Sequence, residues 1–186
     1  MKIIAGALKG RTLKTLTGPA GYRPAMGKVR ESLFSLLEAR GVIWAESVVL
    51  DLFAGSGSLA FEAVSRGAKK AYLVEKDAKA SACIAANAAN LGISGQCLVA
   101  AEDAIKFAGK KPTEQVSVVF IDPPYAENLL PQTLKNLLRR EWLEDGAFVV
   151  AEVEKHLRIN TEGFEGLTLE LDRNYGSTRI IIWYKE

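Results

Sequence analysis

Histidine and cysteine are scarce in this sequence, which has one histidine and two cysteines among its 186 residues. His156 lies in the charged stretch 153–159 with no nucleophilic side chain paired to it, so hydrolases that use a histidine base are not indicated. Cys83 and Cys97 lack the spacing of a metal site and are expected to be reduced thiols. We therefore expect no bound metal.

Long apolar runs are also missing. No stretch approaches the length of a membrane-spanning helix, and the apolar run at the start of the chain is broken by Lys9. We therefore expect no membrane partner, no signal peptide and a cytoplasmic location. A length of 186 residues, 48% of them hydrophobic, fits a single domain over 1–186 with a core of its own.

Residues 118–125, VVFIDPPY, are an apolar run that stops abruptly at Asp-Pro-Pro-Tyr. The run favours a strand that is buried on both faces, as in a parallel sheet. Two prolines cannot continue a central strand, because they have no N–H for the ladder. Open α/β sheets bind ligands beyond the carboxyl ends of their strands. Asp122, Pro123, Pro124 and Tyr125 are therefore expected where a substrate would lie.

These four residues suit the activation of an amine. An exocyclic amine on a nucleobase is a poor nucleophile, because its lone pair is delocalised into the ring. The Asp122 carboxylate and the Pro123 carbonyl could accept its hydrogens, and the prolines would hold these acceptors in place. Tyr125 offers a flat face on which a base can stack. The alternative is a tight turn that merely ends a strand, and these residues alone leave both interpretations open.

A second motif, at 48–68, combines a predicted strand at 48–53, a glycine loop and a helix at 58–66. Gly55, Gly57 and Ala60 match the dinucleotide pattern G-x-G-x-x-G/A, which is weak evidence by itself. Asp51 at the strand end would repel a pyrophosphate but attract a positively charged amino group. S-adenosylmethionine carries such a group and has no phosphate.

The next predicted strand, 71–75, ends in Glu75, 24 residues after Asp51. An acidic residue there can accept hydrogen bonds from ribose hydroxyls. A surface glutamate beside Lys76 is the alternative. The position directly after a strand favours the ligand-binding interpretation.

Together these motifs, D-L-F-A-G-S-G, V-E-K-D and I-D-P-P-Y, resemble those of class I S-adenosylmethionine-dependent amino-methyltransferases. Arg23-Pro24 and the V-R-E-S-L-F at 29–34 are similar to the signature R-P-T-x-D-R-V-R-E-x-L-F of the bacterial RsmD family. The resemblance runs from the opening K-I-I-A-G to the closing Y-G-S-T. The family usually has Thr, Asp and Arg where this chain has Ala25, Gly27 and Lys28.

The resemblance implies methylation of a guanine N2 amine in 16S rRNA by a monomer that acts on an assembling small ribosomal subunit. S-adenosylmethionine would be the methyl donor and S-adenosylhomocysteine the product. Asp103 would contact the adenine amino group, with a helix N-cap as the alternative. The expected cofactor-binding residues are Asp51, Phe53, Ala54, Gly55, Gly57, Glu75, Lys76, Asp103 and Ala104. The expected catalytic residues are Asp122, Pro123, Pro124 and Tyr125.

Positive charge is concentrated in residues 1–40, which hold eight basic and two acidic residues, whereas the rest of the chain carries a net charge of −4. A basic arm and helix on a mildly acidic core, 41–186, fits contact with RNA phosphates. The alternative is a solvated hairpin without a partner. Segments 2–5 and 11–16 predict a β-hairpin arm. The expected RNA contacts are Lys9, Arg11, Arg23, Lys28 and Arg30.

The remaining segments complete a Rossmann-like, doubly wound α/β fold with a mostly parallel seven-stranded sheet. They predict helices at 78–91 and 129–139, strands at 96–100 and 147–152, and an antiparallel pair at 167–171 and 178–184. Asp77 and Gly92 are expected to cap the first of these helices. An apolar stripe is expected to pack a further helix on the domain: Val29, Leu33, Leu36 and Leu37.

Three other functions stay open. A DNA or RNA adenine-N6 or other amino-methyltransferase would use the same D-P-P-Y chemistry, although DNA enzymes of this type usually need an added recognition domain. An NAD-dependent oxidoreductase would use the glycine loop but leaves D-P-P-Y unexplained. A non-catalytic RNA-binding module would not need Asp51 and Glu75.

Overall fold

The computed structural model describes residues 1–16, 24–124, 128–161 and 163–186. Helices and strands alternate as far as the fifth strand, which is typical of an α/β fold. The helices are α1 Pro24–Ala39, the 3-10 turn η1 Trp44–Glu46, α2 Ser58–Ser65, α3 Ala78–Leu91, α4 Ala104–Ala108 and α5 Leu130–Arg139. The strands are β1 Val48–Leu52, β2 Lys70–Val74, β3 Cys97–Ala100, β4 Val116–Ile121, β5 Leu143–Glu154, β6 Leu167–Tyr175 and β7 Thr178–Lys185.

In the described residues, seven strands form one sheet in the order β3-β2-β1-β4-β5-β7-β6. Strands β3, β2, β1, β4 and β5 are parallel, and β7 is antiparallel to both of its neighbours. The strand order reverses between β1 and β4, where open α/β sheets have their ligand crevice. The predicted mostly parallel sheet with a terminal antiparallel pair is confirmed.

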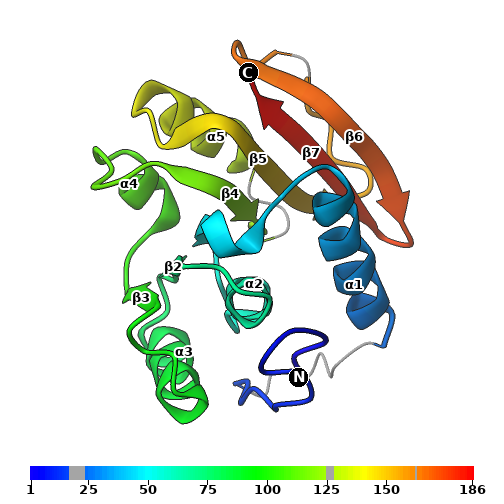
Figure 1. Ribbon diagram of the computed structural model, residues 1–186. Helices are drawn as coiled ribbons and strands as arrows, with labels where there is room; N and C mark the ends of the chain where they lie inside the picture. Colours follow the sequence, from blue (N-terminus) through cyan, green and yellow to red (C-terminus); the bar gives the residue numbers. More distant parts are fainter. Residues whose placement is uncertain (17–23, 125–127, 162) are drawn as a thin grey trace.

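Helices cover both faces of the sheet. Helices α1, α2 and α3 lie on one face, and α4 and α5 lie on the other (Figure 1). Alternate residues of a strand point to opposite faces, so Val118 and Phe120 of β4 join the α1–α3 core while Val119 and Ile121 join the α4–α5 core. Most residues of the central strands are apolar because both faces of these strands are buried, with Asp51 in β1 and Ser117 in β4 as polar positions.

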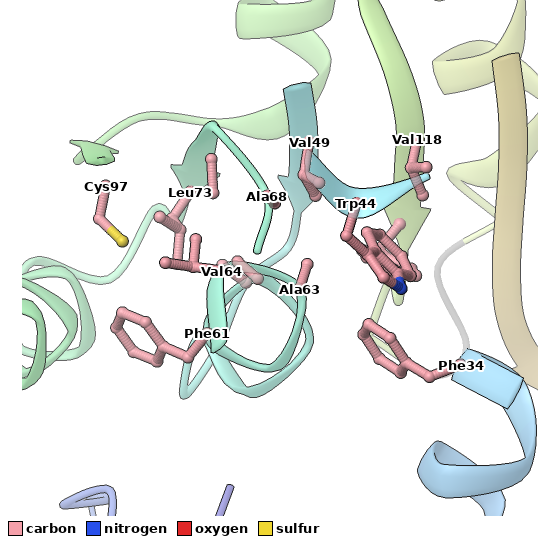
Figure 2. Close-up of a cluster of buried hydrophobic side chains, with 14 of the residues drawn as sticks. Phe34, Trp44, Val49, Phe61, Ala63, Val64, Ala68, Leu73, Cys97 and Val118 are labelled. Atoms are coloured by element: carbon pink, nitrogen blue, oxygen red, sulfur yellow. The ribbon is translucent and has the colours of Figure 1, made fainter. Parts of the chain in front are cut away.

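Aromatic rings fill the core where α1 meets the sheet. Phe34 is fully buried, and its ring centroid lies 5.1 Å from that of Trp44 and 5.7 Å from that of Phe120. Figure 2 shows Phe34 reaching from α1 toward the Trp44 ring. This packing fixes α1 against β4, the strand that leads to Asp122.

The predicted apolar stripe holds α1 on the sheet. Leu33 and Leu37 are buried, and Val29 and Leu36 are partly buried against the same core. With 16 residues, α1 is the longest of the described helices. Across the described ranges, no helix combines the length and the apolar character needed to cross a membrane.

The predicted caps of α3 are present. The Asp77 carboxylate accepts a hydrogen bond from the Ala80 N–H at 2.7 Å, and Gly92 follows the helix with φ +76°. The helix bounds agree with the predicted 78–91 because Asp77 and Gly92 are residue types typical of helix N-caps and C-terminal ends.

Two strands are longer than predicted. Strand β5 starts at Leu143 rather than 147, and β6 continues to Tyr175 rather than 171. In β5 the added Leu143 is buried and pairs with Val116, but the exposed residues 144–146 separate it from the apolar run. The residues added to β6 are polar or partly exposed and lie on the edge strand of the sheet. In β6 one of them, Asp172, forms an ion pair with Arg179 of β7 at 2.5 Å.

The N-terminal arm, residues 1–16, contains the predicted antiparallel pairing in a shortened form. Its two segments share one bridge, Lys2 to Thr12, with backbone hydrogen bonds on either side, from the Ile3 N–H to the Arg11 carbonyl at 3.0 Å and from the Leu13 N–H to the Met1 carbonyl at 2.7 Å, but neither segment forms a strand. Much of the remaining backbone of the arm is bound to the body. The N–H groups of Ile4 and Ala5 donate to the buried carboxylate of Glu62 in α2 at 2.8 and 2.9 Å.

Further hydrogen bonds extend this contact along α2 and α3. The Ala7 N–H donates to the Ser65 carbonyl at 2.7 Å, and the Leu8 N–H donates to the Ser65 hydroxyl at 2.9 Å. Asn87 of α3 accepts from the Lys14 N–H at 2.9 Å and donates to its carbonyl at 2.8 Å. The arm is thus docked on the body, which neither interpretation of the sequence had described.

Candidate active site

Three acidic residues lie near the carboxyl ends of β1, β4 and β5. Asp122 and Glu152 each lie one residue past the paired residues Ile121 and Ala151 of the parallel strands β4 and β5. Asp51 lies in β1, the strand on the other side of β4. By strand alternation all three point to the α1–α3 face, since Val49, Phe120 and Val150 belong to that core.

The structure places Asp122, Pro123 and Pro124 beyond the end of β4, at the predicted edge of the sheet. Pro123 is buried, whereas Asp122 and Pro124 are exposed. The Asp122 N–H donates to the Leu52 carbonyl at 3.5 Å, which ties the turn to β1. Tyr125 lies outside the described residues, so its predicted stacking role stays a prediction.

Burial and the like charges of Glu152 and Asp51 raise the pKa of Asp122 well above its usual value. Asp122 is exposed as a whole residue, and the two neighbouring carboxylates add to the effect of burial on its carboxyl group. Burial also raises the pKa of Glu152, opposed by a hydrogen bond with the Thr178 side chain. In the part of the chain that the structure describes, no group of three or more His, Cys, Asp or Glu side chains is placed to hold a metal ion.

The glycine loop between β1 and α2 turns through left-handed backbone conformations. Phe53 has φ +64°, which is unusual for a residue other than glycine, and Gly55 and Gly57 have φ +54° and +73°. A Cβ at Gly57 would lie 2.8 Å from the Phe61 ring, so this glycine permits close packing. A Cβ at Gly55 would meet only the Phe53 carbonyl, at 3.9 Å, so the loop presents open backbone there.

Asp51 lies behind this loop. Its carboxylate accepts from the Ala60 N–H, in the first turn of α2, at 3.2 Å, and only 2% of the residue is exposed. Burial, with a smaller contribution from Glu75, raises its pKa to about 7, while the bond from Ala60 opposes the rise. The predicted contact with a ligand's amino group stays a prediction.

Glu75 braces the same loop. One carboxylate oxygen accepts from the Gly55 N–H at 2.8 Å, and the other accepts from the Asp77 N–H at 2.9 Å. Glu75 is half-buried and Lys76 beside it is exposed, so Glu75 is not simply a surface glutamate. It stands at the carboxyl end of β2, on the same sheet edge as Asp51.

Asp103 and Ala104 begin α4 at the carboxyl end of β3. The Asp103 carboxylate accepts from the Lys106 N–H at 2.9 Å, so it is the helix N-cap that the sequence offered as the alternative. Ala104 is buried, and Ala54, in the glycine loop, is buried as well. Their predicted cofactor contacts stay predictions.

The predicted RNA-contacting residues fall into two groups. Lys9, Arg11 and Lys28 are exposed, and the Arg11 guanidinium donates to the Asn90 carbonyl at 3.0 Å. Arg30 is buried and donates to the Lys2 carbonyl at 2.6 Å, so it binds the arm to α1. Arg23 lies outside the described residues.

The sequence reasoning missed residues that the structure adds to this edge. Glu152 ends the predicted strand 147–152, and Thr178 begins the predicted strand 178–184. The sequence cannot place Glu152 beside Asp122 without the pairing of β4 with β5, nor Thr178 near Glu152 without the pairing of β5 with β7.

The class of this protein follows from a strand order that reverses between β1 and β4, a braced glycine loop and an Asp-Pro-Pro turn. It has the fold of a class I methyltransferase. A solved structure of a methyltransferase described as SAM-dependent, from Agrobacterium tumefaciens, has a TM-score of 0.63, covers 89% of this chain and 64% of that one, and is 20% identical, which shows the fold alone.

The family follows from the comparisons. A family model described as "Conserved hypothetical protein 95" matches residues 1–184. "Ribosomal RNA small subunit methyltransferase D" of Haemophilus influenzae is 39% identical over 95% of this chain and 89% of its own length. The protein of that name from Escherichia coli K12 is 38% identical over 83% and 75%. The chain belongs to this family, the RsmD family of methyltransferases.

A solved relative agrees with this assignment. The structure of yhhF from Escherichia coli is 32% identical, has a TM-score of 0.85, and covers 100% of this chain and 98% of that one.

Proposed function

We propose that this protein transfers a methyl group from S-adenosylmethionine to the exocyclic N2 amine of a guanine in small-subunit rRNA. The observation that carries the proposal is the Asp-Pro-Pro turn beside the glycine loop, with Glu75 bracing the loop. The relatives named ribosomal RNA small subunit methyltransferase D support the substrate class. We further propose that the protein acts in the cytoplasm as a single-domain monomer on an assembling small subunit.

The residues present fit S-adenosylmethionine. The open backbone at Gly55 lets a ligand approach the loop closely. Glu75 uses one lone pair of each carboxylate oxygen on backbone N–H groups and keeps acceptor capacity for ribose hydroxyls. Asp51 would place a carboxylate near the amino group, and Phe53, Lys76, Asp103 and Ala104 would line the adenosine end.

The chain's own part in the chemistry concerns the amine. When bound, S-adenosylmethionine supplies the methyl group: a carbon–nitrogen bond to N2 forms as the carbon–sulfur bond breaks, and the sulfur keeps the electron pair. The Asp122 carboxylate and the Pro123 carbonyl accept hydrogen bonds from N2 and free its lone pair. Asp122 then takes the proton that N2 loses, and its raised pKa makes it a better acceptor than an ordinary aspartate. Tyr125 would stack on the base.

The test is methyl transfer from labelled cofactor to naked rRNA, to partly assembled small subunits and to duplex DNA, followed by mapping of the modified base. We expect label on a guanine N2 in small-subunit RNA. Asp122→Ala should abolish transfer while the affinity for S-adenosylhomocysteine stays within a small factor of wild type. Asp145→Ala removes an exposed carboxylate elsewhere on β5 and should leave transfer unchanged. Label on adenine, or in DNA alone, would contradict the proposed substrate.

A further inference from the structure

Glu152 lies beside Asp122 on the neighbouring strand. The parallel pair Ile121 and Ala151 directly precedes them, so the two carboxyl groups leave the sheet at the same level and toward the same face. Neighbouring strands are about 4.8 Å apart. Adjacent hydrogen-bonding groups on one edge of a base can therefore engage both residues. Glu152 is half-buried, so its carboxyl keeps access to this edge.

The Thr178 side chain forms a hydrogen bond with Glu152. Thr178 begins β7, and its neighbour two residues on, Ile180, pairs directly with Glu152 across the antiparallel ladder. Strand β5 pairs with β7 on one side and with β4 on the other, so Thr178 and Asp122 lie on opposite sides of Glu152. A carboxylate has enough acceptor positions to bond on both sides.

We infer that Glu152 determines base specificity: its carboxylate accepts the N1–H of the target guanine while Asp122 accepts from the N2 amine. The inference rests on the proposed function and deepens it. Guanine presents N1–H and N2–H side by side on its Watson–Crick edge, so two acceptors from adjacent strands match two adjacent donors. A base taken out of its helix has this edge free. Thr178 is a positioning residue that acts through Glu152.

The charges at this edge favour guanine over adenine. The carboxylates of Glu152 and Asp51 repel that of Asp122, and two N–H donors from one base relieve the repulsion between Asp122 and Glu152. Adenine presents a lone pair at N1, which would face the Glu152 carboxylate and add to the repulsion. A site built around an acceptor rejects a ligand that lacks the matching donor, because the buried group is left unpaired.

The test uses an rRNA fragment that carries either guanine or 2-aminopurine at the mapped target position. 2-Aminopurine keeps the 2-amine but has a lone pair at N1. We expect wild type to favour guanine in kcat/KM by about 100-fold or more. In Glu152→Gln, whose amide can donate to that lone pair, the guanine/2-aminopurine ratio should fall at least tenfold. Glu154→Gln, the same change two residues along the same strand, should leave the ratio unchanged.

Thr178 supplies a second pair of variants that does not depend on the folding of Glu152→Gln. Thr178→Val should lower the same ratio, and Thr178→Ser, which keeps the hydroxyl, should restore it. If Glu152→Gln and Thr178→Val reduce transfer to both bases by the same factor, Glu152 does not contact N1 and the inference is overturned. If wild type methylates no guanine N2, the proposed function itself fails, which is a separate outcome of the same assay.

Discussion

Asp51, Asp122 and Glu152 differ from ordinary surface acids in their protonation. Each has a raised pKa, first because of burial, and for Asp51 and Asp122 also because of neighbouring carboxylates. A carboxyl whose pKa is higher in the folded chain than in the unfolded chain stabilises the fold at low pH and loses that contribution as pH rises through the folded pKa. Ionisation of these three carboxyl groups therefore lowers the stability of the fold near neutral pH.

Asp51 allows this to be measured. Its pKa of about 7, against 3.8 in the unfolded chain, corresponds to roughly 4 kcal/mol of destabilisation above pH 7. Asp51→Asn keeps an acceptor for the Ala60 N–H and removes the charge. We expect it to unfold at a higher urea concentration than wild type at pH 8, with the difference vanishing toward pH 4. Asp145→Asn, at an exposed carboxylate, should show no such pH dependence.

The same substitution should weaken cofactor binding. In wild type, affinity for S-adenosylhomocysteine should rise as pH increases from 5.5 to about 7, because the amino group binds the ionised form of Asp51. In Asp51→Asn the affinity should be lower and almost flat with pH, as followed by calorimetry. Equal pH profiles in the two proteins would show that the amino group is bound elsewhere.

The sequence predicted the position of Asp51 at the ligand-binding edge but not its burial or its raised pKa. Asp51 could be found because it ends an apolar strand before a glycine loop. Its burial, the bond from Ala60 that lowers its pKa and the charge of Glu75 that raises it come together only in the fold. For the same reason Asp122 could be predicted from Asp-Pro-Pro-Tyr, whereas Glu152 needed the pairing of β4 with β5.

At the scale of elements, the arm and α2 form one unit. The Glu62 carboxylate is fully buried and accepts from the Ile4 and Ala5 N–H groups and from Arg66. Ile3 and Leu13 of the arm are also buried in the core. Deleting residues 1–20 would leave a buried carboxylate with fewer partners and expose apolar core. Such a deletion tests stability as well as RNA binding, so point substitutions are needed.

Gly6 and Gly10 offer a matched pair for testing the docking. Both have φ near +80°, but a Cβ at Gly6 would lie 1.8 Å from the Ser65 carbonyl oxygen, whereas a Cβ at Gly10 would meet nothing within 4 Å. Gly10→Ala should destabilise by about 1–2 kcal/mol from backbone strain. Gly6→Ala carries the same strain and must also displace the arm, so we expect a further loss of at least about 2 kcal/mol.

Urea unfolding gives the stabilities of both variants, and limited proteolysis reports whether the arm is released. Early cleavage within residues 1–16 should occur in Gly6→Ala and not in Gly10→Ala. Similar losses in the two variants, with an equally protected arm, would contradict the close approach to α2. The contact between the arm and α2 could not be predicted from the sequence. The helical pattern of 58–66 does not indicate that Glu62 and Ser65 bind residues 57 or 58 positions earlier in the chain.

At the scale of the whole molecule, the docked arm gives the basic residues a fixed place. Residues 1–40 carry a net charge of +6 on a remainder of −4, and Lys9, Arg11 and Lys28 are exposed. The mostly parallel sheet with its terminal antiparallel pair could be predicted because alternating apolar strands and capped helices allow few topologies. The position of the basic residues on the molecule could not be predicted, because it depends on the hydrogen bonds by which Glu62, Arg30 and Asn87 bind the arm.

This placement predicts the salt dependence of RNA binding. Each phosphate neutralised by a cation adds about 0.7–0.9 to the slope of log K against log salt concentration. Lys9→Ala/Lys28→Ala should weaken binding to the rRNA fragment and lower that slope by this amount for each lost contact. The matched double variant Lys111→Ala/Lys135→Ala removes two exposed lysines near α4 and on α5, across the sheet from the arm, and should keep the wild-type slope. Both double variants should bind S-adenosylhomocysteine as wild type does. Equal slopes in the two would mean that RNA phosphates do not lie along the arm and α1.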